Sequence, residues 1–247
     1  MLIMDLNKYE KEIALIEKEL ANLPVGRLVK KQGYYYEVTE QKSIGINLDK
    51  YRIRLHCRKK LLLEQLKIAQ HNLKVLEAKK GFLMHKTPTE IIATLPKTYQ
   101  DLPIKYFYHV TVEKFLSKIS TNSDYKKEDL IYQTEGGILV RSKSEYMIAT
   151  ELERYKIPFL YEAKLSVGTQ KWLPDFTIKS PFTGKNIIWE HFGSFHIKGY
   201  EEQMTKKMKS YFANGYRAFE EVIYTFEFDA ATPGRIQSLI EQIILKR

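Results

Sequence analysis

The chain has 247 residues, 44% of them hydrophobic, and carries 40 Lys and Arg against 30 Asp and Glu, a formal net charge of +10. This length and composition exclude a disordered tail and allow one or two domains with a buried core. The longest apolar runs are far shorter than the roughly 20 residues that span a bilayer, and the first residues lack the apolar stretch of a signal peptide. We therefore expect a cytoplasmic protein without membrane contact. Its single cysteine, Cys57, cannot form a disulfide within the chain.

Two amphipathic segments dominate the first third of the chain. Apolar side chains recur at alternating spacings of four and three from Leu2 to Leu23, and again from Leu62 to Leu76, before Gly81. This spacing is typical of a heptad face on a helix. The segment between them, 24–61, begins with a Pro-Val-Gly break and is expected to be non-helical. The pattern predicts an antiparallel coiled-coil hairpin over residues 1–85, although the same faces could instead pair two copies of the chain in a homodimer.

The tip of this hairpin is basic and rich in tyrosine. Residues 27–60 hold ten Lys and Arg against three Asp and Glu, and residues 28–39 resemble a β-hairpin that turns at Gln32-Gly33. Lysines contact phosphates without reading sequence, and aromatic rings stack on exposed bases. The alternative is that the tyrosines only pack a small sheet and the lysines only solvate it. We expect the tip to bind nucleic acid, DNA rather than RNA, through Arg27, Lys30, Lys31, Tyr34, Tyr36, Arg52 and Arg54.

Residues 86–135 carry less information. Three prolines punctuate the segment, and Val110 to Ile119 has the pattern of a short helix that ends in the polar run 120–124. We interpret 86–135 as a connector that packs on the following domain.

From residue 136 to residue 247 helical and strand patterns alternate. The order is helix, strand, strand, strand, helix, strand, helix, which predicts a small domain with a mixed sheet. The expected helices are 142–155, 200–214 and 234–246, and the expected strands are 158–165, 172–179, 186–192 and 221–226.

Two carboxylates fall on neighbouring predicted strands. Asp175 follows Pro174 in one strand and Glu190 lies in the next, so a hairpin pairing would bring them together. Burying two carboxylates is costly unless a cation neutralises them, and Mg²⁺ commonly binds one or two carboxylates while keeping waters. Such an ion can polarise a phosphodiester and activate a bound water. Glu145, on the first helix of the domain, is a candidate third ligand or only a helix cap, and Glu162 is a supporting residue or only a strand carboxylate.

These motifs resemble the PD-(D/E)xK nuclease superfamily, whose restriction-endonuclease-like fold has an αβββαβ core. The likeness is closer to a group of bacterial and phage members in which a helical region precedes the core. It implies an α+β protein, with the hairpin and its β-tip followed by such a core, and a Mg²⁺-dependent or Mn²⁺-dependent DNA endonuclease with Asp175 and Glu190 as metal ligands and Glu145 assisting. The motifs are RSKSE at 141–145, YE at 161–162, LPDF at 173–176, WEHFG at 189–193, and Lys207 with Tyr211.

The chain departs from the superfamily pattern at one position. A lysine is expected two residues after the glutamate, on the same strand face, and Phe192 stands there. Three residues are candidate replacements. Lys207 is the first choice, because this lysine migrates to other elements within the superfamily. His191 should point to the opposite strand face unless a bulge turns it inward, and His196 lies in the loop beyond.

Three functions therefore compete. The first is a metal-dependent nuclease that grips nucleic acid with the basic hairpin. The second is a nucleic-acid-binding or assembly module whose nuclease-like core no longer cuts. The third is a coiled-coil scaffold without nucleic acid, which a flat dependence of DNA affinity on salt would favour.

Overall fold

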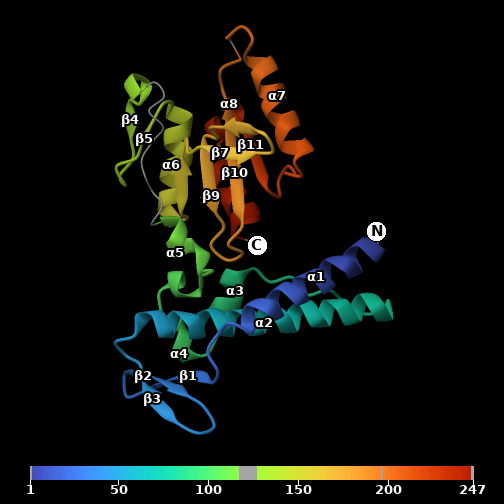
Figure 1. Ribbon diagram of the computed structural model, residues 1–247, viewed down its shortest axis with the longest axis vertical. Helices are drawn as coiled ribbons and strands as arrows, with labels where there is room; N and C mark the ends of the chain where they lie inside the picture. The colour runs from blue at the N-terminus through green and yellow to red at the C-terminus, as the bar shows by residue number, and fades with distance from the viewer. Residues whose placement is uncertain (1, 117–126, 196, 246–247) are drawn as a thin grey trace. The chain divides into compact units, whose positions relative to one another are not determined.

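The computed structural model describes residues 2–116, 127–195 and 197–245 and shows a mixed α+β protein (Figure 1). The chain divides into two compact units, Met1–Tyr108 and His109–Arg247. Within the described ranges, no helix is both long enough and apolar enough to cross a membrane.

The first unit is built on two long helices. Helix α1 (Leu2–Leu20) packs along α2 (Lys50–Ala78), and the two run antiparallel (Figure 1). Tyr9 and Ile16 of α1 and Leu62 and Ala69 of α2 are buried, so the predicted heptad faces do form the helix contact. The helical hairpin expected from the sequence is confirmed in this respect.

The start of α2 contradicts the prediction that residues 24–61 are non-helical. The helix begins at Lys50, where the Asp49 side chain caps it by accepting a hydrogen bond from the Arg52 amide at 2.8 Å. The buried face of this first stretch includes His56 and Arg58, and these polar residues interrupt the apolar pattern in the sequence. Arg52 and Arg54 therefore lie on α2 and not on the β-tip.

The predicted β-hairpin is present. Strands β1 (Arg27–Lys31) and β2 (Tyr34–Val38) pair antiparallel around Gln32 and Gly33, whose φ angles of 48° and 85° suit the tight turn. A third strand, β3 (Ser43–Gly45), extends the sheet and was not predicted.

A charged cluster fastens this sheet to α2. Glu37 of β2 is buried and accepts two hydrogen bonds from the Arg52 guanidinium, at 2.6 and 2.9 Å. The His56 ring contacts the same carboxylate at 2.7 Å. Together, with Arg52 the larger influence, they lower the pKa of Glu37 to about 2 despite its burial. The cluster explains how a short, strongly basic sheet is held to the helix.

Replacing Glu37 with Gln should destabilise the first unit by about 1 to 3 kcal/mol at pH 7, because the amide offers Arg52 and His56 one neutral acceptor oxygen in place of two charged ones. Since the pKa of Glu37 is lower in the folded chain than in the unfolded chain, its contribution is present above about pH 4 and disappears as the pH falls toward 2. Melting curves from pH 2 to pH 7 should thus show the gap between wild type and variant closing at low pH. Exposed Glu40→Gln is the matched control, and a gap of constant size would contradict the expectation.

The rest of the first unit consists of short helices. Cys57 of α2 is buried, and burial raises the pKa of its thiol to about 12, which favours the protonated form at neutral pH. The elements are α3 (Pro88–Ala93), α4 (Lys97–Gln100) and the 3₁₀ turn η1 (Ile104–Phe107).

The second unit begins within the predicted connector. The expected helix from Val110 is present as α5 (Thr111–Leu116), and the polar run 120–124 lies outside the described residues. Two short pieces lead into the core: the 3₁₀ turn η2 (Lys127–Asp129) and the strand pair β4 (Tyr132–Gln133) and β5 (Leu139–Val140).

The core of the second unit is a four-stranded mixed sheet with the order β11-β10-β9-β6. Strand β9 pairs antiparallel with both β6 and β10, and β10 pairs parallel with β11. The strands are β6 (Phe159–Tyr161), β9 (Phe176–Lys179), β10 (Asn186–Phe192) and β11 (Val222–Phe226).

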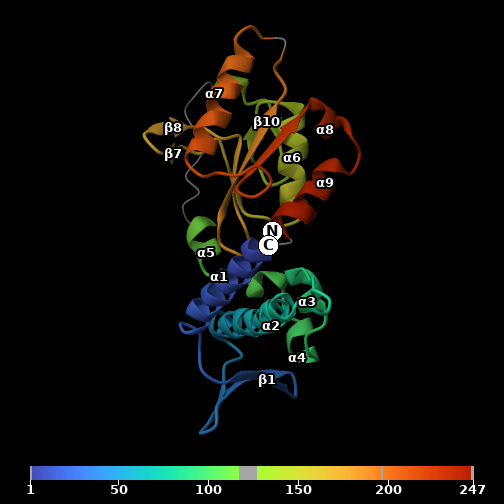
Figure 2. The same cartoon turned by 90° about the vertical axis from the view of Figure 1, so that its right-hand side faces the viewer.

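Helices cover both faces of this sheet (Figure 2). On one face, Ile148 and Leu152 of α6 (Lys143–Arg154) pack with Trp189, as do the C-terminal α9 (Arg235–Leu239) and the π-helical η3 (Ile240–Ile244). On the other face, Tyr211 of α7 (Tyr200–Ala213) packs on Ile188 and Val222. A short α8 (Glu227–Ala231) follows β11.

The two longest predicted strands are corrected by the structure. Strand β6 ends at Tyr161, and β7 (Leu165–Val167) with β8 (Gln170–Trp172) forms a separate hairpin around Gly168. The predicted strand 172–179 is therefore divided, because Pro174 has no amide hydrogen for a sheet ladder and β9 begins only at Phe176. Asp175 lies in the bend just before β9.

Candidate active site

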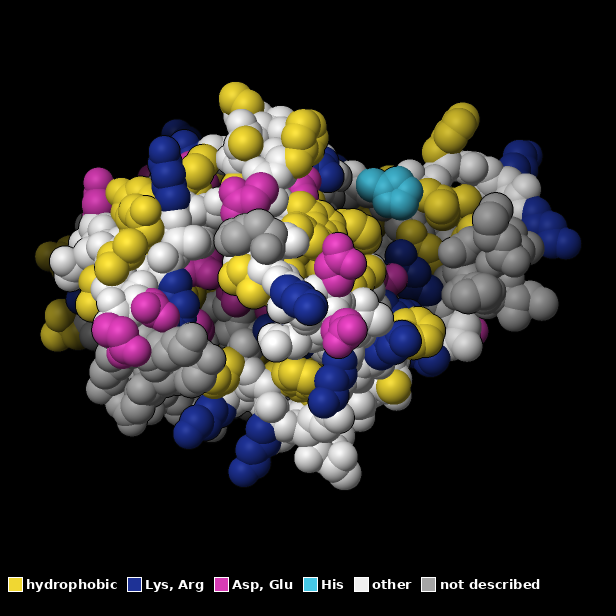
Figure 3. All heavy atoms as spheres, turned by 90° about the horizontal axis from the view of Figure 1, so that it is seen from above, with side chains coloured by type: hydrophobic (Ala, Val, Ile, Leu, Met, Phe, Trp, Pro, Cys, Tyr) yellow, Lys and Arg dark blue, Asp and Glu magenta, His cyan; other side chains and the backbone are white. Residues whose placement is uncertain are grey.

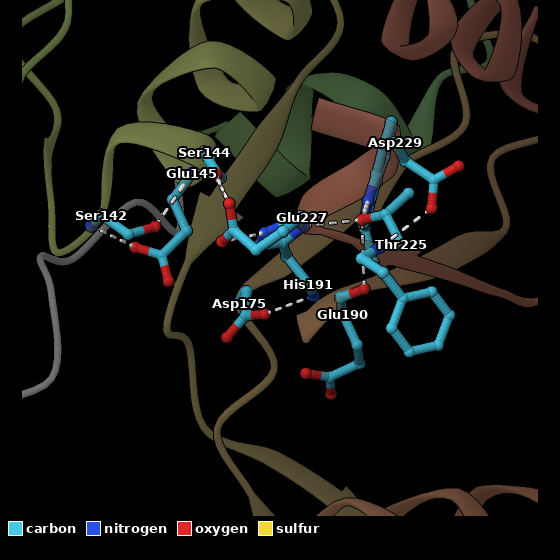
Figure 4. A network of polar contacts seen from close by, with 11 residues as sticks. Ser142, Ser144, Glu145, Asp175, Glu190, His191, Thr225, Glu227 and Asp229 are labelled. Atoms are coloured by element: carbon cyan, nitrogen blue, oxygen red, sulfur yellow. Dashed lines mark hydrogen bonds and ion pairs between the residues drawn. The ribbon is translucent and has the colours of Figure 1, made fainter. Parts of the chain in front are cut away.

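Sheet register brings the two candidate carboxylates together. Trp189 of β10 pairs with Phe176 of β9, so Asp175 and Glu190 are the next opposed positions. The amide of His191 donates a hydrogen bond to Asp175 Oδ2 at 2.6 Å, which extends the contact past the end of the regular ladder (Figure 4). Although Asp175 is not in a strand, the predicted juxtaposition with Glu190 is present.

Glu190 is fully buried and is held by two side chains of α7. Lys207 Nζ lies 2.5 Å from Oε2, and the Tyr211 hydroxyl donates to Oε1 at 2.5 Å. Lys207 Nζ also donates to the Leu173 carbonyl at 3.1 Å, which ties it to the segment that leads to Asp175. Residues 207 and 211 are one helical turn apart, so a single face of α7 clamps both oxygens of the carboxylate.

The electrostatics of this group favour a further cation. Burial, with the charge of Glu190 adding to it, raises the pKa of Asp175 well above its usual range. Burial also raises the pKa of Glu190, because Lys207 and Tyr211 offset the desolvation only in part. Burial alone would lower the pKa of Lys207, but the two carboxylates outweigh it and raise that pKa. Lys207 therefore stays protonated. Its single positive charge faces two carboxyl groups, which leaves room for a second cation.

Glu145 fulfils the helix-capping role that the sequence left open. Its Oε2 accepts hydrogen bonds from the amides of Arg141 and Ser142, at 2.9 and 3.0 Å, and from the Tyr161 hydroxyl at 2.8 Å. The Ser142 hydroxyl completes a capping box by accepting from the Glu145 amide. The charge of Glu145 still contributes to the raised pKa of Asp175, so it belongs to the surroundings of the site.

An ion pair that the sequence did not predict, between Arg141 and Glu162, fixes the backbone at Asp175. The Arg141 guanidinium binds both oxygens of Glu162, at 2.6 and 2.8 Å. The Glu162 backbone adopts a left-handed φ of 44°, and its amide donates to the Asp175 carbonyl at 3.0 Å. Both residues stand inside the RSKSE and YE motifs, which were the available indication that they belong together.

The His191 side chain does not contact Glu190. The His191 imidazole lies on the opposite face of the sheet, as strand alternation predicted, where its ring nitrogens contact Thr225 and Glu227, each at 3.1 Å (Figure 4). Ser144 donates to the other oxygen of Glu227 at 3.0 Å. His196 lies outside the described residues. Of the three candidates, the structure brings Lys207 to the carboxylates.

The residues expected to bind nucleic acid at the tip divide into three groups. Arg27, Lys31 and Tyr34 are exposed. Lys30 forms an ion pair with Asp101 at 2.7 Å, and Arg52 is committed to Glu37. The remaining two, Tyr36 and Arg54, are partly buried.

The donor set fits a hard divalent cation bound by two carboxylates. Each carboxylate oxygen has two lone pairs, so the Glu190 oxygens that accept from Lys207 and Tyr211 retain acceptor capacity. Oδ2 of Asp175 accepts from His191, and Oδ1 of the same carboxylate would offer one more oxygen ligand. No group of three or more His, Cys, Asp or Glu side chains within the described ranges is arranged to hold a metal. Mg²⁺ suits such a sparse site, because it keeps several waters.

No family model, curated protein or solved structure matched this chain.

Proposed function

We propose that the protein is a metal-dependent nuclease that hydrolyses phosphodiester bonds in DNA, in the manner of the PD-(D/E)xK superfamily. The observation that carries the proposal is the opposed pair of Asp175, which is half-buried, and Glu190, which is fully buried, with Lys207 bound to Glu190. Strongly perturbed carboxylates beside a lysine are costly to maintain, and such costs concentrate at functional sites. The mixed sheet with α6 and α7 on opposite faces is compatible with an αβββαβ core and supports the same reading.

Each residue then has a defined task. Asp175 and Glu190 would hold Mg²⁺ or Mn²⁺, which supplies Lewis acidity and lowers the pKa of bound water. Lys207 favours the ionised form of Glu190 and offers a cation to a phosphate oxygen, the role that the superfamily pattern gives to a lysine at the position of Phe192 on β10. Tyr211 fixes the Glu190 carboxylate by its hydrogen bond. Arg141, Glu145 and Glu162 are positioning residues that fix the backbone before β9.

A nucleic-acid-binding module without cleavage activity is the second candidate. It is favoured by the engagement of both Glu190 oxygens with α7 and by Phe192 at the position of the usual lysine.

Incubation of the purified chain with plasmid and single-stranded DNA, in Mg²⁺ or Mn²⁺, tests the two candidates. We expect cleavage by the wild type that chelation stops and that Glu190→Ala abolishes. If the wild type binds DNA but cuts neither substrate with either metal, the binding module is correct and the nuclease proposal fails.

We also propose that the exposed part of the β-tip contacts DNA phosphates. Lys31→Glu should lower DNA affinity about uniformly across sequences and reduce the slope of log affinity against log salt by about 1. Lys30→Gln is the matched control, because Lys30 already pairs with Asp101 and should change the slope much less. Filter binding at several salt concentrations measures both, and equal slopes for Lys31→Glu and wild type would remove the tip from the interface.

A further inference from the structure

Aromatic rings form an exposed cluster beyond the end of β10. Phe195 and Phe226 are 44% and 38% exposed, and their ring centroids lie 5.9 Å apart. Tyr200, at the start of α7, packs edge-on against Phe195 at 5.6 Å. We call Phe195, Tyr200 and Phe226 the aromatic shelf. Figure 3 shows hydrophobic side chains exposed among charged ones near the centre of the face it displays. Large rings left in water at one place indicate a binding surface.

The shelf rests on the residue that replaces the expected lysine. Phe192 is buried, with its ring stacked on Tyr224 at 5.9 Å and within 6.4 Å of Tyr200 and 5.9 Å of Phe226. Since residues two apart in a strand share a face, Phe192 lies on the same side of the sheet as Glu190.

Sheet register places the shelf beside the carboxylates. In the pairing of β10 with β11, Glu190 is opposite Tyr224 and Phe192 is opposite Phe226 of the shelf. The Phe192 ring contacts Phe226 and Tyr200, so the shelf begins two strand positions from Glu190 on the same face of the sheet. The aromatic shelf and the carboxylate pair are therefore neighbouring parts of one surface.

We propose that the aromatic shelf stacks unpaired bases of a DNA strand whose phosphodiester lies at Asp175 and Glu190, so that the enzyme acts on single-stranded DNA or unpaired DNA ends. This inference rests on the proposed nuclease function. Bases stacked within a duplex do not present their faces, whereas those of a single strand do, and aromatic side chains bind them with little regard to sequence. Lys198, exposed in the same loop as Phe195, is suited to the strand's phosphates.

A fluorescence experiment tests the shelf without requiring cleavage. The wild-type chain in EDTA is titrated into a single-stranded oligonucleotide that carries 2-aminopurine, whose emission falls when it stacks on a ring. We expect strong quenching by the wild type. Phe195→Leu/Phe226→Leu, which keeps apolar bulk but removes both rings, should lose most of it and bind about 10-fold more weakly. Phe212→Leu, at an exposed ring elsewhere on α7, should behave as the wild type.

Cleavage rates provide a second test of the shelf. In Mg²⁺ the wild type should cut single-stranded DNA faster than the same sequence as a duplex, and the double variant should lose that preference. Two results would overturn the proposal that the shelf stacks bases, while the nuclease function stands. One is quenching by the double variant equal to that of the wild type; the other is equal cleavage of single-stranded and duplex DNA by the wild type. If the wild type cuts nothing, the nuclease proposal fails, and quenching alone then decides whether the shelf binds bases. Melting curves confirm folding, and single Phe195→Leu serves if the double variant does not fold.

Discussion

Replacing Asp175 with Asn should remove DNA cleavage while making the protein more stable. Cleavage should fall about 100-fold to 1,000-fold, because the amide cannot supply the charge that a divalent cation requires. The amide oxygen can still accept the hydrogen bond from the His191 amide, so the local backbone is retained. Initial rates on the preferred DNA substrate in Mg²⁺ measure the first effect.

The gain in stability follows from the perturbed carboxyl. Burial and Glu190 raise the pKa of Asp175 in the folded chain above its value in the unfolded chain. Its favourable contribution is therefore complete below about pH 4 and is lost as the pH rises through the folded value. The Asn variant lacks this loss and should be more stable by about 0.5 to 2 kcal/mol at neutral pH in the absence of metal, with the difference shrinking toward pH 4.

Magnesium should reverse the order of stability, so that the wild type becomes more stable than the Asn variant. Mg²⁺ binds the folded wild type and stabilises it by mass action, whereas the Asn variant gains little. Urea titrations at pH 4 and pH 8, with EDTA or Mg²⁺, contain all four comparisons. Glu135→Gln, at an exposed carboxylate of the same unit, controls for the general loss of a negative charge. A less stable Asn variant in EDTA at pH 8 would show that Asp175 is an ordinary structural carboxylate.

Much of this site could be predicted from the sequence because its two carboxylates lie close together in the chain, on consecutive paired strands. The turn between β9 and β10 is short, so the pairing of Asp175 with Glu190 follows from strand spacing alone. Strand alternation likewise predicted that His191 would face away from Glu190. Where the backbone is regular, the sequence is a sufficient guide to which side chains share a face.

What could not be predicted depends on contacts between distant residues. The Arg141 and Glu162 ion pair spans two elements that only the folded sheet brings together. The early start of α2 was hidden because its buried side includes Arg58, which is satisfied by Glu19 of α1 at 2.7 Å. An arginine in a core reads as a surface residue until its partner is known.

Phe192 shows how one departure from a motif can have two consequences. The strand position at which the proposed nuclease pattern has a lysine carries a ring packed on Tyr224, Tyr200 and Phe226. The positive charge comes instead from α7, where Lys207 reaches the same carboxylate from outside the strand. Under the proposed function, Lys207 thus supplies the positive charge of the site, and Phe192 supports the aromatic shelf beside it.

Replacing Lys207 with Met should lower cleavage about 100-fold or more and destabilise the protein by about 3 to 5 kcal/mol at pH 8. The reason is that Glu190, fully buried, would lose its one cationic partner and keep neutral hydrogen bonds, among them the one from Tyr211, against its desolvation. Its pKa, already raised by burial, should rise further, and protonation at pH 5 should relieve part of the cost. Chemical unfolding at the two pH values measures the difference.

Two further variants separate the charge pair from simple packing. Lys206→Met removes the neighbouring exposed lysine of α7 and should leave stability near that of the wild type. Glu190→Gln/Lys207→Met removes both charges and should recover most of the stability lost in Lys207→Met, because no unpaired charge stays buried, while cleavage stays absent. This result would show that stability depends on pairing the Glu190 and Lys207 charges, whereas cleavage requires that both side chains be present. A double variant as unstable as Lys207→Met would mean that Lys207 acts through its packing, and an active Lys207→Met would remove this lysine from the site.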